Sequence, residues 1–176
     1  MDPVFIISGK IGSGKTTLAQ ALAEACGFPR ISFSDVVRME AKKRGLGDSR
    51  DELQTVGEDL VAHTPREFCE RVLVLGGYEA GKGFVVDGLR HIEILHLIKS
   101  MVAPQAVTHL HIASPEELRI KRLEARGRAG ESTIAVEHHS TEIQLGLTLP
   151  SVADHLLDGS LQIEELVGDI RSRWAV

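Results

Sequence analysis

One short segment constrains the fold of this chain more than any other. Residues 9–16 read Gly-Lys-Ile-Gly-Ser-Gly-Lys-Thr, which fits the pattern GxxxxGK(S/T) without a mismatch. An apolar run, Val4–Ser8, precedes this segment, and residues with helical spacing over 16–25 follow it. A buried strand, a glycine-rich turn and a helix in that order form a backbone cradle for phosphate groups. The motif therefore predicts a nucleotide-binding α/β protein.

Each residue type in this loop has a physical role. Glycine lets the backbone curl so that successive N–H groups point at phosphate oxygens, and the helix N-terminus adds positive charge. Lys15 is predicted to bind the β- and γ-phosphates, and the Thr16 hydroxyl to coordinate Mg²⁺. The expected cofactors are therefore ATP and Mg²⁺. The candidate nucleotide-binding residues are Gly9, Gly12, Ser13, Gly14, Lys15, Thr16 and Thr17.

The composition excludes several other classes of protein. The chain has 176 residues, 43% hydrophobic and 26% charged, which suits a single globular domain over 1–176. Cys26 and Cys69 lack zinc or disulfide spacing, so we expect buried thiols in a reducing, cytoplasmic setting. No apolar run reaches about 18 residues, so no membrane partner is expected. Aromatic residues make up 4% and the net charge is −5, which argues against a general nucleic-acid-binding surface.

Strand-like and helix-like segments alternate along the chain. Strands are predicted over 4–8, 31–33, 84–86, 107–112 and 155–157, and helices over 16–25, 35–43, 49–63, 67–75, 93–102, 114–126 and 161–174. This alternation predicts a three-layer α/β P-loop NTPase fold with a parallel five-stranded sheet, whose carboxyl edge holds the ligands. The helical region 34–80 is expected to bind the phosphoryl acceptor, and the glycine-interrupted stretch 127–140 to form a short flap (lid).

An acidic residue follows the predicted strand at 84–86. Asp87 would point into the ligand edge, where a carboxylate beside a phosphate loop can hold Mg²⁺. Gly88 permits close backbone approach, and Arg90 suits bidentate phosphate binding. The alternative is an Asp-Gly turn followed by a surface arginine. We predict that Asp87 is a catalytic metal ligand and that Arg90 and His91 contact the acceptor.

Asp35 and Arg38 open the helix after the second predicted strand, again at the ligand edge. Asp35 either caps this helix or acts catalytically by orienting and deprotonating an acceptor hydroxyl, and the sequence leaves both roles open. Arg38 lies one turn further on, where it would hold an acceptor phosphate.

Arginines recur at near-helical spacing just before the flap, at Arg119, Arg122, Arg126 and Arg128. A basic helix face is usually just solvated. One beside a flap can instead close over the transferred phosphoryl group and neutralise its charge. We assign this catalytic role to Arg122 and Arg126.

Histidines form two further patterns. The sequence Glu-His-His at 137–139, followed by Glu142, offers no third ligand on one helical face. We therefore interpret it as a flap or substrate contact rather than a metal site. His109 and His111 alternate along a predicted strand and are interpreted as structural residues.

Nearly the whole chain resembles the nucleoside monophosphate kinase-like P-loop proteins, which include adenylate kinase, dephospho-coenzyme A kinase and phage deoxynucleotide kinases. Residues 35–38 (Asp-Val-Val-Arg) are similar to the Asp-x-x-Arg segment of the family. Residues 87–90 (Asp-Gly-Leu-Arg) resemble its Asp-Gly-x-x-Arg segment, with the arginine one position early. The stretch 50–57 resembles an Arg-x-x-Leu-Gln-x-x-Gly helix, which implies acceptor contacts for Arg50 and Gln54.

These patterns together predict an ATP-dependent phosphotransferase whose partner is a small nucleotide, most simply a (deoxy)nucleoside monophosphate. One alternative is a kinase of a hydroxyl acceptor, either dephospho-coenzyme A or a hydroxymethylated base in DNA. A second alternative is a nucleotide-dependent regulator with little turnover. A DNA acceptor would need a basic groove. Its candidate residues are Arg38, Lys42, Lys43, Arg44 and Arg50. Monomer and homodimer both fit the sequence.

Overall fold

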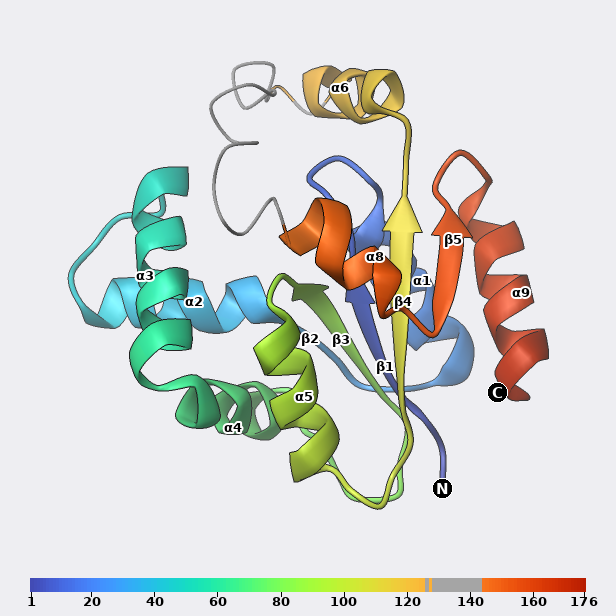
Figure 1. The fold of residues 1–176 in the computed structure, drawn as a ribbon, viewed down its shortest axis with the longest axis horizontal. Coiled ribbons are helices and arrows are strands. Elements are labelled where there is room, and N and C mark those ends of the chain that lie inside the picture. The colour runs from blue at the N-terminus through green and yellow to red at the C-terminus, as the bar shows by residue number, and fades with distance from the viewer. Residues whose placement is uncertain (126, 128–143) are drawn as a thin grey trace.

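The computed structural model of the chain describes residues 1–125, 127 and 144–176. These residues form three layers, a parallel sheet in the centre and helices on each side of it (Figure 1). The strand order is β2-β3-β1-β4-β5, with β1 at Val4–Ser8, β2 at Arg30–Ser32, β3 at Phe84–Leu89, β4 at Val107–Ala113 and β5 at His155–Asp158. The predicted fold class, with its five parallel strands, is confirmed.

Helices cover both faces of this sheet (Figure 1). One face carries α1 (Lys15–Cys26) and α9 (Ile163–Trp174), and the other carries α2 (Phe33–Lys43), α4 (Pro65–Leu75) and α5 (Ile92–Met101). The remaining helices are α3 (Arg50–His63), which packs on α2 and α4, α6 (Glu116–Ala125) after β4, and the short α8 (Leu149–Ser151) after a π-helical turn at Gln144–Thr148.

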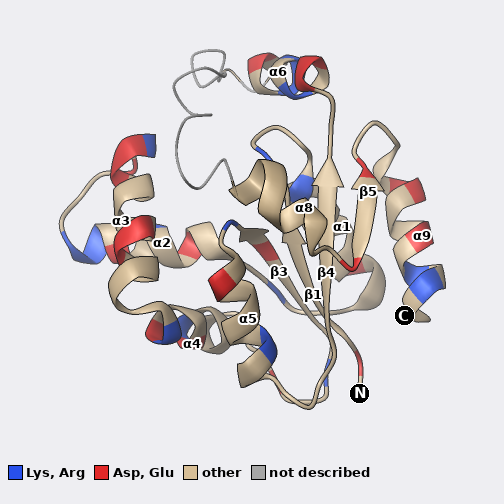
Figure 2. Ribbon diagram, in the orientation of Figure 1, with Lys and Arg blue, Asp and Glu red and all other residues tan. Residues whose placement is uncertain are grey.

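The strand β1 shows why an uninterrupted apolar run marks the centre of the sheet. Phe5 and Ile7 point into the core beneath α1 and α9, whereas Val4 and Ile6 point into the core beneath α2, α4 and α5. All four side chains are fully buried, because helices cover both faces of a parallel sheet. Charged side chains lie mainly on the surrounding helices (Figure 2).

Several predicted boundaries move by one to three residues, and two of them bear on the site. The helix α2 starts at Phe33 because Ser32 ends β2 and caps the helix: its hydroxyl accepts from the Ser34 N–H. The strand β3 continues to Leu89, so Asp87 lies within the strand rather than after it. In both places the tertiary pairing of strands decides the boundary.

Two further expectations concern the environment of the chain. Within the described residues, no helix is long and apolar enough to cross a bilayer. Cys69 is buried, which raises the pKa of its thiol to about 12, whereas Cys26 is only half-buried. The predicted burial is therefore confirmed for Cys69 and holds only in part for Cys26.

Candidate active site

The glycine-rich loop joins β1 to α1 and takes a backbone path that side chains would block. Gly9, Gly12 and Gly14 have φ values of 155°, 77° and 98°. A Cβ at Gly9 would lie 2.7 Å from the Ile112 carbonyl oxygen, and one at Gly12 would lie 2.7 Å from that of Arg119. At Gly9 and Gly12 both the conformation and the space exclude a side chain, whereas at Gly14 the conformation alone disfavours one.

The helix α6 holds the outer side of this loop. Arg119, which is buried, donates from Nη1 to the Ile11 carbonyl at 3.3 Å. Arg122 donates from Nη1 to the Ser13 carbonyl at 3.1 Å and from Nη2 to the Gly159 carbonyl at 2.9 Å. The guanidinium of Arg122 therefore ties the loop to the segment after β5. Its predicted contact with the transferred phosphoryl group stays a prediction.

Ser114 contributes a third contact to the same loop. Its hydroxyl donates to the Ser13 carbonyl at 3.0 Å, and α6 starts at Glu116 rather than at position 114. Helical periodicity indicates neither the contact of Arg119 nor that of the Ser114 hydroxyl. The sequence therefore does not predict that these two residues bind the loop.

The inner side of the loop faces Asp87, which is 1% exposed on β3. Burial raises the pKa of this carboxyl group, while the charge of Lys15 and a hydrogen bond from Thr16 act in the opposite direction. Asp87 Oδ1 has no hydrogen-bond partner among the described residues, and neither has the buried Ser13 hydroxyl.

This arrangement fits the predicted Mg²⁺ and phosphate ligands. Mg²⁺ prefers oxygen donors, and Thr16 and Asp87 bring a hydroxyl and a carboxylate together beside the loop. A buried carboxylate oxygen without a partner is costly unless a cation compensates it. The Ser13 hydroxyl and the loop N–H groups suit phosphate oxygens in the same way.

A cavity of about 360 Å³ extends from this point between the sheet and α3. Its lining includes Lys15, Thr16 and Asp87 at the loop and Arg38, Arg50 and Arg90 beyond it. Gln54, Glu58 and His91 also line the cavity, and its apolar lining comprises Phe33, Val37, Leu53, Val61, Phe68 and Ile94. The structure therefore brings the predicted donor and acceptor residues to one cavity, although they come from distant parts of the chain.

Asp35 is engaged at the start of α2, although its charge still acts on Asp87 and raises the pKa of that carboxyl group. Asp35 Oδ2 accepts from the Ser32 backbone N–H at 3.1 Å, which completes a capping box, and its Oδ1 lies 3.5 Å from Arg38 Nη1. The described residues that line the cavity do not include Asp35. Of its two predicted roles, the geometry favours the helix cap.

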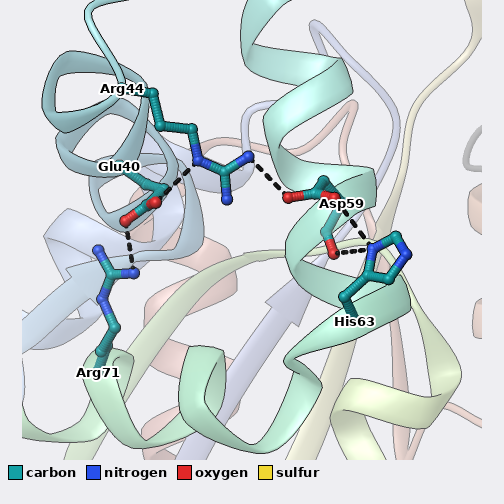
Figure 3. A network of polar contacts seen from close by, with 5 residues as sticks. All are labelled: Glu40, Arg44, Asp59, His63 and Arg71. Carbon is teal, nitrogen blue, oxygen red and sulfur yellow. Dashed lines mark hydrogen bonds and ion pairs between the residues drawn. The ribbon is translucent and has the colours of Figure 1, made fainter.

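A network of charges fixes the helices that form the acceptor side of the cavity (Figure 3). Glu40 on α2 accepts from Arg44 Nε and from Arg71 Nη1 on α4, both at 2.8 Å. Arg44 also donates to Asp59 on α3 at 2.6 Å, and His63 lies 2.9 Å from the same carboxylate. These contacts hold the pKa of Glu40 below its usual value. Arg44, one of the residues expected for a basic groove, is engaged within this network.

A second polar cluster lies buried behind the glycine-rich loop. Ser8 Oγ lies 2.7 Å from His109 Nε2 and 2.8 Å from His111 Nδ1. A hydroxyl carries one proton, so Ser8 donates to one imidazole and accepts from the other. Burial lowers the pKa of both histidines to about 4, which leaves both rings neutral near pH 7. The structural interpretation of these histidines is consistent with this geometry, but their contact with Ser8 could not be predicted.

Several predicted residues lie outside the described part of the chain. These are Arg126, Arg128, the Glu-His-His segment at 137–139, Glu142 and all of the flap 127–140 except Gly127. Among residues 1–125, 127 and 144–176, no three His, Cys, Asp or Glu side chains cluster in a way that could hold a metal ion.

The glycine-rich loop between β1 and α1 and the strand order 2-3-1-4-5 define a P-loop protein of the kinase-like α/β class. Residues 8–138 match the AAA domain family. A UPF0200 protein of Pyrobaculum aerophilum is 31% identical over 179 residues, which cover 97% of this chain and 95% of that protein. The chain belongs to the AAA domain family and to the UPF0200 proteins within the P-loop class.

Solved structures agree with the fold. A gluconokinase from Sinorhizobium meliloti superposes with a TM-score of 0.60 at 18% identity, covering 98% of this chain and 91% of that one. The Mycobacterium tuberculosis APS kinase in complex with AMPPNP and APS has the same TM-score and identity, covering 97% and 96%. The resemblance to P-loop kinases is thus confirmed for the fold. These structures do not identify the phosphoryl acceptor of this chain.

Proposed function

We propose that this protein transfers the γ-phosphoryl group of ATP to the phosphate of a (deoxy)nucleoside monophosphate. One observation carries the proposal: a single cavity joins the loop residues Lys15 and Thr16 to Arg38, Arg50 and Arg90. Guanidinium groups bind phosphate oxygens in bidentate fashion, so a second phosphate group has a binding site beside the first.

In this proposal the loop and the arginines mainly hold and orient the reactants. The loop N–H groups and Lys15 bind the β- and γ-phosphates of ATP, while the arginines bind the acceptor phosphate. An oxygen of the acceptor phosphate attacks the γ-phosphorus, and the bond from that phosphorus to the β–γ bridging oxygen breaks. The products are ADP and a nucleoside diphosphate. Positioning and charge neutralisation supply most of the rate enhancement.

Thr16 and Asp87 are the residues that would hold Mg²⁺ in this mechanism. A bound Mg²⁺ neutralises negative charge on the β- and γ-phosphate oxygens. The partner-free oxygen supports this assignment, since Asp87 Oδ2 lies 4.0 Å from Arg30 Nη1 whereas the buried Oδ1 has no hydrogen-bond partner among the described residues.

The position of Asp35 argues against Asp35 as the base for a hydroxyl acceptor. A hydroxyl must lose its proton during transfer, and a carboxylate base would have to reach it. Asp35 was the predicted base, but it caps α2 and does not line the cavity. A phosphate oxygen is already ionised near pH 7 and needs no such base.

A hydroxyl acceptor remains the second candidate because of the structural neighbours. Gluconokinase and APS kinase share the fold of this chain, and their names denote kinases of small molecules. If this protein has an acceptor of that kind, the same cavity would bind it, with the arginines holding another anionic group.

The proposal is tested by offering ATP labelled at the γ-phosphate, with Mg²⁺, to a panel of acceptors. The panel contains ribo- and deoxynucleoside monophosphates, dephospho-coenzyme A and DNA with hydroxymethyluracil. We expect labelled nucleoside diphosphate, and none with Lys15→Met. Label on a hydroxyl acceptor alone would establish the second candidate. Slow ATP hydrolysis without any labelled acceptor would overturn both and favour a nucleotide-dependent regulator.

A further inference from the structure

The wall of the acceptor cavity formed by α3 carries polar groups in a regular row. Arg50, Gln54 and Glu58 follow one another at intervals of four residues, and all three line the cavity. Such spacing places them on one face of the helix, a turn apart. The row presents a guanidinium group, then an amide, then a carboxylate.

This wall lies on the side of the cavity away from the glycine-rich loop. In Figure 1, α3 stands at the outer edge of the molecule, and α2 runs outward from the sheet and crosses behind α3. Lys15, Thr16 and Asp87 belong to α1 and β3, at the sheet. Arg50 lies at the start of α3 and Glu58 two turns further on, about 12 Å along the helix, so an acceptor whose phosphate is bound at Arg50 can reach Glu58 with its other end.

Glu58 lies close to the start of α5, on the opposite side of the cavity. Its negative charge raises the pKa of His91, although burial has the larger effect and lowers that pKa overall. His91 is thus neutral near pH 7. Glu58 also takes part in polar contact within the protein. A carboxylate has about four lone-pair positions, so such contact leaves further acceptor sites for a ligand.

Apolar side chains flank this polar row and suit a flat ring. Phe33, Val37, Leu53 and Ile94 line the same cavity. Phe33 and Phe68, which also pack on each other with ring centroids 5.5 Å apart, both line the cavity. Apolar side chains can bury the faces of a base and leave its edge to the polar groups.

An ionised carboxylate accepts hydrogen bonds and cannot donate them. Cytosine and adenine carry an exocyclic amino group, at C4 and C6 respectively, that can donate to it. Uracil, thymine and hypoxanthine present a carbonyl oxygen at that place, and two facing acceptors repel one another. We propose that Glu58, assisted by Gln54, makes the acceptor site select a base with an amino group at this position, which is cytosine or adenine. This inference rests on the proposed function, since it names the substrate class of the same site.

The test compares substrates that differ by one group. CMP and UMP form one pair and AMP and IMP another, because each pair exchanges an amino group for a carbonyl oxygen. We expect kcat/KM to favour the amino member by at least about 10-fold in whichever pair the protein uses, as for sites that pair a substrate N–H. Glu58→Gln should reduce that ratio about 10-fold or more, since an amide can donate as well as accept.

Asp51→Asn provides a matched control on the same helix. Asp51 is exposed and does not line the cavity, so this charge change should leave the ratio unaltered. Circular dichroism and ATP binding establish that each variant is folded. The ratios of the wild-type protein test the selection of substrates even if Glu58→Gln fails to fold.

The outcomes separate the inference from the function on which it rests. Equal or better use of UMP or IMP by the wild-type protein would overturn the inference and leave the proposed function intact. An unchanged ratio in folded Glu58→Gln would overturn the role of Glu58. Failure to label any nucleoside monophosphate would overturn the proposed function itself.

Discussion

The two ends of the cavity are constructed by different means. At the donor end, the backbone of the loop forms the site. Gly9, Gly12 and Gly14 have positive φ values, which residues with side chains rarely adopt. At the acceptor end, long side chains from α2, α3 and the end of β3 converge, and ion pairs hold their helices in place. The donor end is encoded locally, whereas the acceptor end depends on packing between distant segments.

Changes at the donor end should affect turnover most. In Asp87→Asn, kcat should fall by about 10²–10³, the usual cost of removing one group that stabilises transition-state charge. The melting temperature should rise by about 2–4 °C, or about 1 kcal/mol, because the amide removes a buried charge with a partner-free oxygen. Labelled-ATP kinetics and thermal melting measure the two effects. Loss of both activity and stability would make Asp87 a structural residue instead.

Changes at the acceptor end should affect binding of one substrate only. Arg38→Ala should raise KM for the acceptor about 10- to 100-fold, the worth of a charge-assisted hydrogen bond, and leave KM for ATP within about 3-fold. Steady-state kinetics with each substrate varied in turn provide the measurement. The control is Arg66→Ala, an exposed arginine of α4 that pairs with Glu70. Equal changes in both KM values would erase the distinction between the two ends.

The network behind the acceptor wall should matter for stability. Glu40→Gln should lower the melting temperature by about 4–8 °C, corresponding to about 2 kcal/mol for weakened bonds to Arg44 and Arg71. KM for the acceptor should rise by less than in Arg38→Ala. Glu70→Gln, in an exposed pair with Arg66, should leave melting unchanged. A melting temperature equal to that of the wild type would show that the network does not hold these helices together.

The histidine cluster behind the donor loop should make stability depend on pH. Burial lowers the pKa of His109 and His111 from 6.5 to about 4, so between these values the unfolded chain binds more protons than the folded one. Unfolding free energy should therefore rise from pH 4 to pH 6.5 and then level off. Urea titrations across this range measure the slope. His111→Asn should reduce it, because it removes one of the two buried imidazoles.

The smallest effect is expected at Asp35. Asp35→Asn keeps an oxygen that can accept from the Ser32 N–H, so kcat should change less than about 3-fold. Melting should fall by no more than about 2–4 °C, since only the charge near the helix N-terminus is lost. A drop in kcat of about 100-fold would restore Asp35 as a base and favour a hydroxyl acceptor.

Much of the fold follows from local signals. The apolar run at 4–8, the glycines of the loop and the helical spacing after it predict the donor end, because neighbouring residues alone determine that geometry. Local signals do not decide the role of Asp35, because a carboxylate near the start of a helix suits a helix cap and a catalytic base equally well. The hydrogen bonds of Arg122 could not be predicted either, because their acceptors are distant in the sequence. The Ser13 carbonyl lies 109 positions away and the Gly159 carbonyl 37.

The sequence by itself therefore determined the class of fold and the site for a nucleotide phosphate, since strand, glycine loop and helix are adjacent along the chain. The tertiary structure decided which side chains face the acceptor. In the folded chain, Asp35 caps α2 and Arg44 pairs with Glu40 and Asp59. Glu58 lines the cavity together with His91. Those outcomes depend on how separate helices pack on one sheet, which local patterns do not specify.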